Sequence, residues 1–462
     1  MLTPQWIAKA TDGKLVRAQP VAVSGFSTDT RTIRPHQVFI ALPGATHDGH
    51  EFLDEAFQKG ASAAVISDAT LAHLKSHANL VLVANTQDSL YRMAQAYRSL
   101  FQTSLIGITG SVGKTTTKEL LGRLLQTRFK SYHSPGNWNN EIGLPLSMLN
   151  MPFGTQIGVF ELATQRPGEL QPLAELVNPS VGVITTVTDA HSGNFSSVEE
   201  LVNEKWSLIN ALPLAGGMVV LNADTPLLWS RATHMRFRVD FAIERAGVAY
   251  RAEDIAWHDL DGMSFTLVHP SGSTRLHSKL LGTHNIYNIL AACAVAMEMR
   301  VDAHAVQQVV ADFAPFPHRL ECTPSQLGII VDDCYNASPT AVKAAVAAIS
   351  QLNSAKRKVF VFGDMLELGE RAVDYHQEVG DWVHASNIQQ VFTLGQLAAV
   401  TARTLQKQHG WSPHDAQAAQ SLDELETCMK RTLSDENNLI LVKGSRSMAL
   451  DQLVDHLKQP QK

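Results

Sequence analysis

The sequence lacks several features that mark particular classes of protein. Its four cysteines stand far apart among 462 residues, which disfavours a disulfide framework or a zinc site and is typical of a reducing compartment. The first residues show no basic start, apolar run and small-residue cleavage site, as a secretory signal would. No apolar stretch approaches the roughly 20 residues that span a bilayer. We therefore expect a cytoplasmic protein without a transmembrane segment.

An excess of charge of one sign is lacking too. Lysine and arginine number 38 against 44 acidic residues, which gives a formal net charge of -6. This balance argues against a nucleic-acid partner, because no basic region is strong enough to hold a phosphate backbone. A mildly acidic protein that binds anionic ligands must gather positive potential locally, from a few cationic side chains and backbone N–H groups.

The chain does contain a steady alternation of short apolar runs and helical stretches. Many runs are apolar on both faces, as buried parallel strands are, and their alternation with helices predicts an α/β fold. Predicted strands include residues 38–42, 63–66, 80–83, 105–109, 157–161, 181–187, 218–221, 329–332, 359–362, 391–394 and 439–442. A helix ends near residue 100, and a proline-rich linker lies near residue 315. The predicted domains are therefore 1–100, 101–314 and 315–462.

The segment Leu105-Ile-Gly-Ile-Thr-Gly-Ser-Val-Gly-Lys-Thr-Thr predicts a phosphate-binding loop (P-loop) between a strand and a helix. Glycines let backbone N–H groups close around phosphate oxygens, and the helix N-terminus adds partial positive charge. Lys114 can reach the β- and γ-phosphates of a nucleotide, and the Thr115 hydroxyl can bind Mg²⁺. The pattern is a shorter variant, since Ile108 stands where the general motif has glycine, and an ordinary turn is the other interpretation. The predicted nucleotide-binding residues here are Gly110, Ser111, Gly113, Lys114, Thr115 and Thr116.

Further motifs follow this loop in a fixed order. They are Asn137-Trp-Asn-Asn-Glu, Glu161 at the end of a strand, His191 after the next strand, Lys205 on a helix, His284-Asn-Ile-Tyr-Asn, Pro317-His-Arg-Leu-Glu and Asp332-Asp-Cys-Tyr-Asn-Ala. Each motif alone is weak, but their joint order resembles the Mur ligase family over essentially the whole chain. Three segments resemble the member that adds D-alanyl-D-alanine: Ser27-Thr-Asp-Thr-Arg, Gly363-Asp-Met-Leu-Glu-Leu-Gly and Lys443-Gly-Ser-Arg-Ser.

The resemblance implies both an architecture and a reaction. It implies a first domain for the UDP part of the substrate, a central P-loop domain for ATP with Mg²⁺, and a Rossmann-like C-terminal domain for the incoming dipeptide. The implied reaction is ATP-dependent ligation of D-alanyl-D-alanine to UDP-N-acetylmuramoyl-tripeptide through an acyl phosphate. The product would be the UDP-linked pentapeptide precursor of peptidoglycan. We expect a monomer.

Besides Thr115, three residues are candidate metal ligands. Glu161 ends a buried strand, where α/β proteins form ligand sites, and its hard oxygen atoms suit Mg²⁺. The resemblance makes His191 a second ligand and makes Lys205 the carrier of a CO₂-derived carbamate, which would hold a second Mg²⁺. From the residues alone, these three could equally be a helix cap, a solvated loop histidine and an exposed helix lysine.

Two asparagines and an arginine are candidate nucleotide contacts. Asn285 and Asn288 share one face at the start of a helix and offer the donors and acceptors that an adenine edge requires. Arg319 follows the linker, where its planar guanidinium could hold phosphate. Helix capping and a surface salt bridge are the alternative interpretations.

The third domain supplies an acid in the Mur ligase pattern. Asp333 resembles the residue that lies near the ATP phosphates, with Tyr335 and Asn336 beside it, and Asp332 competes for the same role. The predicted catalytic set is Lys114, His191, Lys205, Arg319 and Asp333.

Substrate contacts are predicted on polar turns of the first and third domains. The turn at residues 27–31 could bind uracil or diphosphate, residues 48–50 form a second candidate wall, and Lys443 or Arg446 could meet the dipeptide carboxylate. Each turn could also lack a ligand. The predicted substrate-binding residues are Ser27, Thr28, Asp29, Arg31, Asp48, Gly49, His50, Asn140, Lys443 and Arg446.

Other functions remain open at this point. Another amino-acid-adding Mur-type ligase or a folylpolyglutamate ligase would share many motifs, although the segment at residues 363–369 argues against both. A P-loop switch would hydrolyse or exchange nucleotide independently of any amine. The third residue of the tripeptide, lysine or diaminopimelate, is also open.

Overall fold

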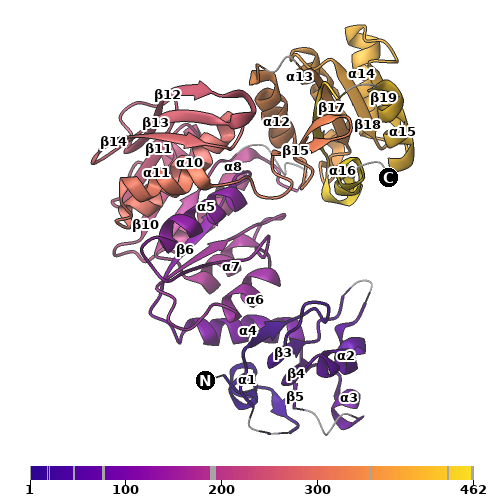
Figure 1. Ribbon diagram of the computed structural model, residues 1–462. Helices are drawn as coiled ribbons and strands as arrows, with labels where there is room; N and C mark the ends of the chain where they lie inside the picture. The colour runs from indigo at the N-terminus through magenta and orange to yellow at the C-terminus, as the bar shows by residue number, and fades with distance from the viewer. Residues whose placement is uncertain are drawn as a thin grey trace.

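The computed structural model describes residues 2–17, 19, 21–44, 47–74, 79–187, 194–353, 356–433 and 436–458. The chain folds into three α/β lobes that follow one another in sequence, each with its own sheet (Figure 1). The middle lobe joins the first lobe below it in that view to the third lobe at its upper side. The predicted α/β class is therefore confirmed.

The first lobe contains a five-stranded sheet in the order β1-β5-β4-β3-β2, parallel except for the β1–β5 pair. Its strands are β1 (Lys14–Leu15), β2 (Gly25–Ser27), β3 (Gln37–Ile40), β4 (Ala63–Ile66) and β5 (Leu80–Leu82). Its helices are α1 (Pro4–Thr11), α2 (Leu53–Gln58), α3 (Ala69–Leu74) and α4 (Thr86–Arg98). Helix α4 begins where the Asn85 side chain accepts hydrogen bonds from the N–H groups of Gln87 and Asp88, as a good N-cap residue does.

The middle lobe contains a nine-stranded sheet in the order β14-β13-β12-β11-β10-β9-β6-β8-β7. Its strands are β6 (Ser104–Thr109), β7 (Ser131–His133), β8 (Ile157–Glu161), β9 (Val181–Ile184), β10 (Met218–Asn222), β11 (Arg238–Ala242), β12 (Tyr250–Trp257), β13 (Met263–His269) and β14 (Gly272–Ser278). Its helices are α5 (Lys114–Gln126), α6 (Gly143–Leu149), α7 (Leu170–Val177), α8 (Val198–Asn210), α9 (Pro226–Arg231), α10 (Thr283–Glu298) and α11 (Ala303–Asp312). The antiparallel strands β12–β14 are not among the predicted strands. Many residues of β12 and β14 are partly exposed and polar, whereas most residues of β13 are buried.

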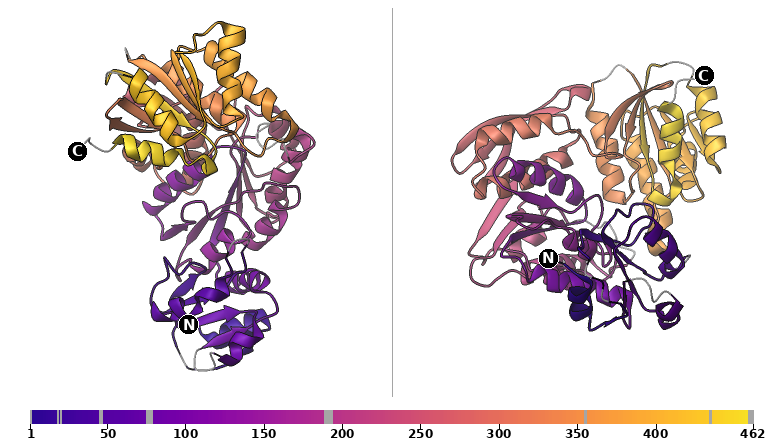
Figure 2. Two further views of the ribbon diagram at one scale, coloured as in Figure 1. Left: turned by 90° about the vertical axis from the view of Figure 1, so that its right-hand side faces the viewer. Right: turned by 60° about the horizontal axis from the view of Figure 1, so that its bottom comes forward.

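The third lobe contains a six-stranded sheet in the order β15-β16-β20-β17-β18-β19, parallel except for the β15–β16 pair. Its strands are β15 (Glu321–Ser325), β16 (Gly328–Asp332), β17 (Arg357–Gly363), β18 (Gln390–Leu394), β19 (Ala416–Ala419) and β20 (Asn438–Lys443). Its helices are α12 (Pro339–Gln351), α13 (Ala372–His384), α14 (Ala398–His409), α15 (Leu422–Thr432) and α16 (Leu450–Lys458). Helices cover both faces of this sheet, as in a doubly wound fold (Figure 2).

The first and middle lobes share a continuous hydrophobic core. Tyr97 of α4 packs in one cluster with Leu144 and Leu149 of α6, and its hydroxyl donates to the Met151 carbonyl at 2.7 Å. The Asn150 carboxamide bonds both the N–H and the carbonyl of Phe26. The first predicted boundary thus lies beside a tightly packed interface, and both boundaries stay predictions.

None of the helices described has the length and apolar character that a bilayer-spanning segment requires. The longest of them, α10, packs within the core of the middle lobe. Its start, close to α5, contributes to the site below.

Candidate active site at the phosphate loop

The turn between β6 and α5 requires glycine at two positions. Gly110 and Gly113 have φ angles of 149° and 86°. A Cβ atom would lie 2.1 Å from Thr185 Oγ1 at the first position and 2.0 Å from Asn288 Oδ1 at the second, distances that no side chain tolerates. The Lys114 ammonium bends back over the turn and donates to the carbonyls of Gly110 (2.8 Å) and Ser111 (3.2 Å). The helix begins at Lys114, as predicted.

A threonine and a glutamate meet beside this turn. Strand β8 pairs with β6 and places Glu161 opposite Ile108, so the carboxylate lies close to the start of α5. Thr115 Oγ1 donates to Glu161 Oε2 at 2.9 Å, and Asn139 Nδ2 donates to Glu161 Oε1 at 2.8 Å. Both Thr115 and Glu161 are buried. The cluster offers the oxygen donors that Mg²⁺ prefers.

Lys205 is buried, with only 1% of its surface exposed, which rules out the interpretation as an exposed helix lysine. Burial and the nearby Lys114 charge hold the pKa of Lys205 well below its usual value, and Glu204 and Glu169 oppose that shift. The Glu204 carboxylate already accepts hydrogen bonds from the N–H groups of Gly168 and Leu170. Lys205 therefore lies in the interior with a strong tendency to be neutral.

Arg319 brings the third lobe to the phosphate loop. Its Nη2 donates to Thr115 Oγ1 at 3.1 Å, across 204 positions of sequence. Its guanidinium carbon lies 4.3 Å from the centre of the Tyr335 ring, a cation–π distance. Burial and the Arg319 charge lower the pKa of Lys114, and Glu161 opposes the shift. Cationic groups from two lobes thus concentrate at one turn.

The neighbouring residues Asp332 and Asp333 face different surroundings. Lys443, at the end of the adjacent strand β20, pairs with Asp333 Oδ2 and donates to the Asn336 carbonyl at 3.0 Å. Burial raises the pKa of Asp333, whereas Lys443 and Arg319 oppose that rise. Asp332 instead accepts a hydrogen bond from a linker histidine. Of the two acids, Asp333 therefore lies on the side of Arg319.

A cavity of about 460 Å³ lies between the middle and third lobes. It is lined by Asn137, Gln165, Tyr335, Asn336, Ala337, Ser338, Leu366, Glu367, Leu368, Ser445, Arg446 and Ser447. Four segments singled out in the sequence, far apart along the chain, thus form one concave surface. Arg446 lines this cavity and pairs with Asp451 at 2.9 Å, whereas Lys443 is engaged by Asp333.

Comparison with known proteins agrees with this geometry. The models "Mur ligase family, catalytic domain", "Mur ligase middle domain" and "Mur ligase, glutamate ligase domain" match residues 22–101, 108–296 and 318–446. The UDP-N-acetylmuramoyl-tripeptide–D-alanyl-D-alanine ligase of Bacillus subtilis is 33% identical over 98% of this chain and 97% of that protein. The chain belongs to the Mur ligase family.

Solved Mur ligases have the same three-lobed fold. A crystal structure of MurF from Acinetobacter baumannii covers 99% of both chains with a TM-score of 0.86 at 24% identity. MurF from Thermotoga maritima in complex with ADP covers 94% of this chain and 97% of that one, with a TM-score of 0.78 at 27% identity. The predicted family, three-domain architecture and class of ATP-dependent ligase are confirmed.

The predicted adenine contacts of this Mur ligase lie directly at the loop. Asn288 Nδ2 donates to Asn285 Oδ1, and Asn285 Nδ2 donates to the Leu281 carbonyl, both at 2.8 Å. Asn288 also lies against Gly113, and Thr116 is buried nearby in α5. These asparagines brace the start of α10 against the loop, and their contact with adenine stays a prediction.

Sequence reasoning selected Asn140 from an asparagine-rich turn, but a neighbour makes the contact with Glu161. The Asn140 side chain accepts from the N–H groups of Ile142 and Gly143 at the start of α6. Asn139 is the residue that reaches Glu161. Only the tertiary fold distinguishes the two, because the composition of the turn is equally polar at each position. His191, the other predicted metal ligand, lies outside the described residues.

In the first lobe of the Mur ligase, the predicted substrate residues bond to one another. Arg31 makes a bidentate pair with Asp29, and Ser27 Oγ donates to the Asp29 carbonyl while Thr28 lies half-buried between them. Asp29 is partly exposed and Arg31 is exposed, so a ligand could draw them from their present partners, whereas Ser27 is buried.

Residues 48–50, the second candidate substrate-binding segment of that lobe, are held by contacts within the protein. His50 Nδ1 donates to Asp48 Oδ1 at 2.6 Å, and His50 Nε2 accepts from the Ser67 N–H at 2.9 Å. A Cβ atom at Gly49 would lie 2.7 Å from the Leu42 nitrogen. The contacts account for these residues as a structural turn, and their substrate contact stays a prediction.

Proposed function

We propose that this Mur ligase joins D-alanyl-D-alanine to UDP-N-acetylmuramoyl-tripeptide at the expense of ATP. The observation that carries the proposal is the convergence of the phosphate loop, Glu161 and Arg319 beside the cavity between two lobes. The name of the Bacillus subtilis relative, which matches nearly end to end, supports this choice over other amine substrates. The expected reaction is the one that the sequence motifs predicted.

The proposed reaction has two steps, a phosphoryl transfer and the formation of an amide bond. The terminal carboxylate of the tripeptide attacks the γ-phosphorus of ATP, and the bond from that phosphorus to the β-phosphate oxygen breaks. ADP departs, and the tripeptide now carries an acyl phosphate. The neutral amine of D-alanyl-D-alanine then attacks the acyl carbon, inorganic phosphate departs, and the nitrogen loses a proton. Lys114 and Arg319 face the phosphate charge in the first step, a role that requires fixed cations more than covalent chemistry.

Thr115 and Glu161 would hold Mg²⁺ in this site. Their oxygens are 2.9 Å apart and both residues are buried, and a hydroxyl and a carboxylate offer the oxygen donors that Mg²⁺ prefers. When bound, Mg²⁺ neutralises phosphate charge. His191 is assigned as a further ligand by the Mur ligase pattern.

Lys205 would act as a carbamate. Burial lowers the pKa of Lys205 and so favours the neutral amine, which can attack CO₂ and release a proton to form an anionic oxygen ligand. The nearby Lys114 charge would then favour the modified residue, because an anionic carbamate attracts that cation.

The remaining predicted residues are assigned by position. Tyr335 and Asn336 line the cavity, and we expect these two residues and Asp333 to contact the nucleotide. Arg446, which also lines the cavity, would be a better placed partner for the dipeptide carboxylate than Lys443, which is paired with Asp333. Residues 27–31 and 48–50 of the first lobe would meet the UDP part. We also propose that the enzyme is a cytoplasmic monomer, since ATP and its UDP-linked substrate occur in the cytoplasm.

Phosphate release with one substrate omitted at a time tests the proposal. Wild-type protein should release phosphate rapidly only with ATP, UDP-tripeptide and D-alanyl-D-alanine together, and mass spectrometry should show the pentapeptide. Assays with glutamate or single amino acids as the amine, and with lysine- or diaminopimelate-containing tripeptides, define the substrate. Hydrolysis of ATP alone at the full rate would instead support a P-loop switch and contradict the ligase function.

A further inference from the structure

The turn that carries Arg319 has an unusual backbone. The Arg319 N–H donates to the Phe316 carbonyl at 3.1 Å, which closes a four-residue turn with Pro317 second and His318 third. His318 has a φ of 60°, and Leu320 has a φ of 55°. A positive φ at the third position of such a turn normally requires glycine. A histidine there persists only if its surroundings hold it.

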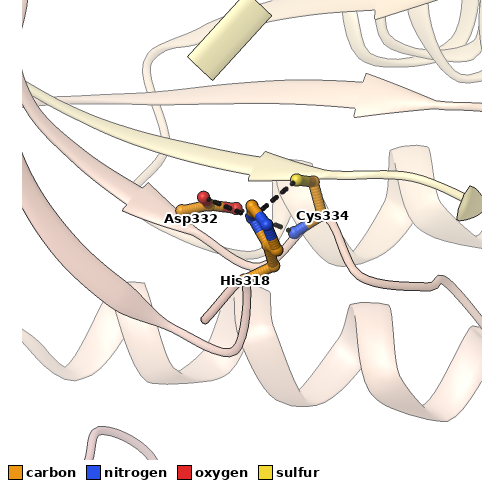
Figure 3. A group of neighbouring side chains, drawn as sticks. All are labelled: His318, Asp332 and Cys334. Atoms are coloured by element: carbon orange, nitrogen blue, oxygen red, sulfur yellow. Dashed lines mark hydrogen bonds and ion pairs between the residues drawn. The ribbon is translucent and has the colours of Figure 1, made fainter. Parts of the chain in front are cut away.

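The surroundings of His318 hold both its side chain and its backbone. Nδ1 donates to Asp332 Oδ2 at 2.8 Å, and the other oxygen of Asp332 accepts from the Cys334 N–H at 3.2 Å (Figure 3). The His318 carbonyl accepts from the Tyr335 N–H at 3.3 Å. Asp332 is completely buried. The turn is thereby fixed to the segment that follows β16.

These contacts connect Asp332, through the turn, to the phosphate loop. Arg319 stacks on Tyr335, whose N–H bonds His318, and Arg319 also reaches Thr115. We propose that Asp332 and His318 are positioning residues that set the backbone of this turn and so hold Arg319 at the phosphate loop. The inference rests on the proposed ligase function.

The same three side chains could be taken for a metal site, because donor atoms of His318, Asp332 and Cys334 lie within 4.8 Å of one another. Two observations argue against it. Lys458 places its ammonium 3.8 Å from Asp332 Oδ2, where it would repel a dication. Burial and the neighbouring Asp332 raise the pKa of the Cys334 thiol, which opposes the thiolate that a metal requires.

Two substitutions of His318 separate positioning from general packing. Asparagine tolerates a positive φ and keeps an N–H donor near the place of Nδ1, whereas leucine has similar bulk but neither property. We expect His318→Leu to lower kcat by about 10- to 100-fold through misplacement of Arg319. His318→Asn should stay within about threefold of wild type. Equal losses in both variants would contradict the proposal.

Combination with Arg319→Met tests whether the effect passes through the arginine. If His318 acts through Arg319, the losses in kcat do not multiply. Adding His318→Leu to Arg319→Met should therefore lower kcat by a further factor of about two at most. Asp332→Asn, which leaves the turn sequence intact, should show the same non-additive loss and covers the case in which His318→Leu fails to fold. Full multiplication of the separate losses would overturn the proposal.

A matched control and two further outcomes complete the experiment. Lys458→Met removes another neighbour of Asp332 without touching the turn, and its kcat should equal that of wild type. Tight binding of Zn²⁺ by wild type, abolished by Cys334→Ser, would favour the metal site and overturn positioning. Absence of ligation by wild type would overturn both the function and this inference, whereas additive losses in an active enzyme refute only the inference.

Discussion

The phosphate site of the middle lobe and the predicted UDP site of the first lobe differ in how far their charged side chains are exposed to solvent. Glu161 and Lys205 expose 2% and 1% of their surface, and each side chain lies in an interior where electrostatic interactions are strong and desolvation of a charge is costly. The side chains of Asp29 and Arg31 expose 35% and 85% and neutralise each other in water, where such pairs contribute little to stability. The charged residues of the phosphate site are therefore held in place by the folded protein, whereas the predicted UDP site presents exposed groups that would have to change partners to bind a ligand.

The largest effect is expected at the phosphate loop. Lys114→Ala removes the cation that faces the transferred phosphate, so kcat should fall by about 100-fold or more. Steady-state ligation assays measure the loss, with Lys130→Ala as an exposed-lysine control in the same lobe. Turnover close to that of wild type would place the active site elsewhere.

The next effect concerns the buried lysine of α8. Lys205→Ala removes the proposed carbamate, and kcat should fall on the order of 100-fold. Added acetate or formate should restore part of the activity in this variant but not in Lys114→Ala, because a small carboxylate can replace a missing anion but not a missing cation. Unchanged activity at any CO₂ concentration would exclude the carbamate.

The pH dependence of the free energy of unfolding gives a second test of the buried lysine Lys205. The folded-state pKa of Lys205 is lowered from 10.5, so between the two pKa values the unfolded chain binds more protons and the stability of wild type rises with pH. Lys205→Met should therefore be more stable than wild type near neutral pH. This advantage should shrink by at most about 1.4 kcal/mol per pH unit and vanish near pH 10.5. Denaturant unfolding in CO₂-free buffer measures it, and a difference independent of pH would show that Lys205 titrates normally.

The smallest effect is expected in the first lobe. Arg31→Ala should raise the KM for the UDP-tripeptide by about three- to tenfold and leave kcat unchanged, because an exposed group contributes to binding rather than to the transition state. The Tm should shift by no more than about 1 °C. Lys14→Ala, also exposed in this lobe, is the control. A large fall in kcat would show that the two sites are coupled more closely than the comparison implies.

Local sequence patterns accounted for much of the framework. The phosphate helix begins at Lys114, and β4 and β8 have the predicted bounds, because apolar runs and glycine turns determine these elements from neighbouring residues. Strands β12 and β14 escaped prediction because many of their residues are polar and partly exposed. Their pairing depends on partners along the sheet rather than on their own hydrophobicity.

The site residues divide in the same way. The glycine turn, the lysine and threonine that follow it, and the motifs of the Mur ligase pattern could all be recognised before folding, since each motif consists of residues close together in the chain. The folded structure was needed to show that Lys205 is buried, that Asn139 rather than Asn140 reaches Glu161, and that Asp332 bonds His318 while Asp333 bonds Lys443. Desolvation and hydrogen-bond direction arise from atoms distant in sequence, and a list of residues does not contain them until the chain has folded.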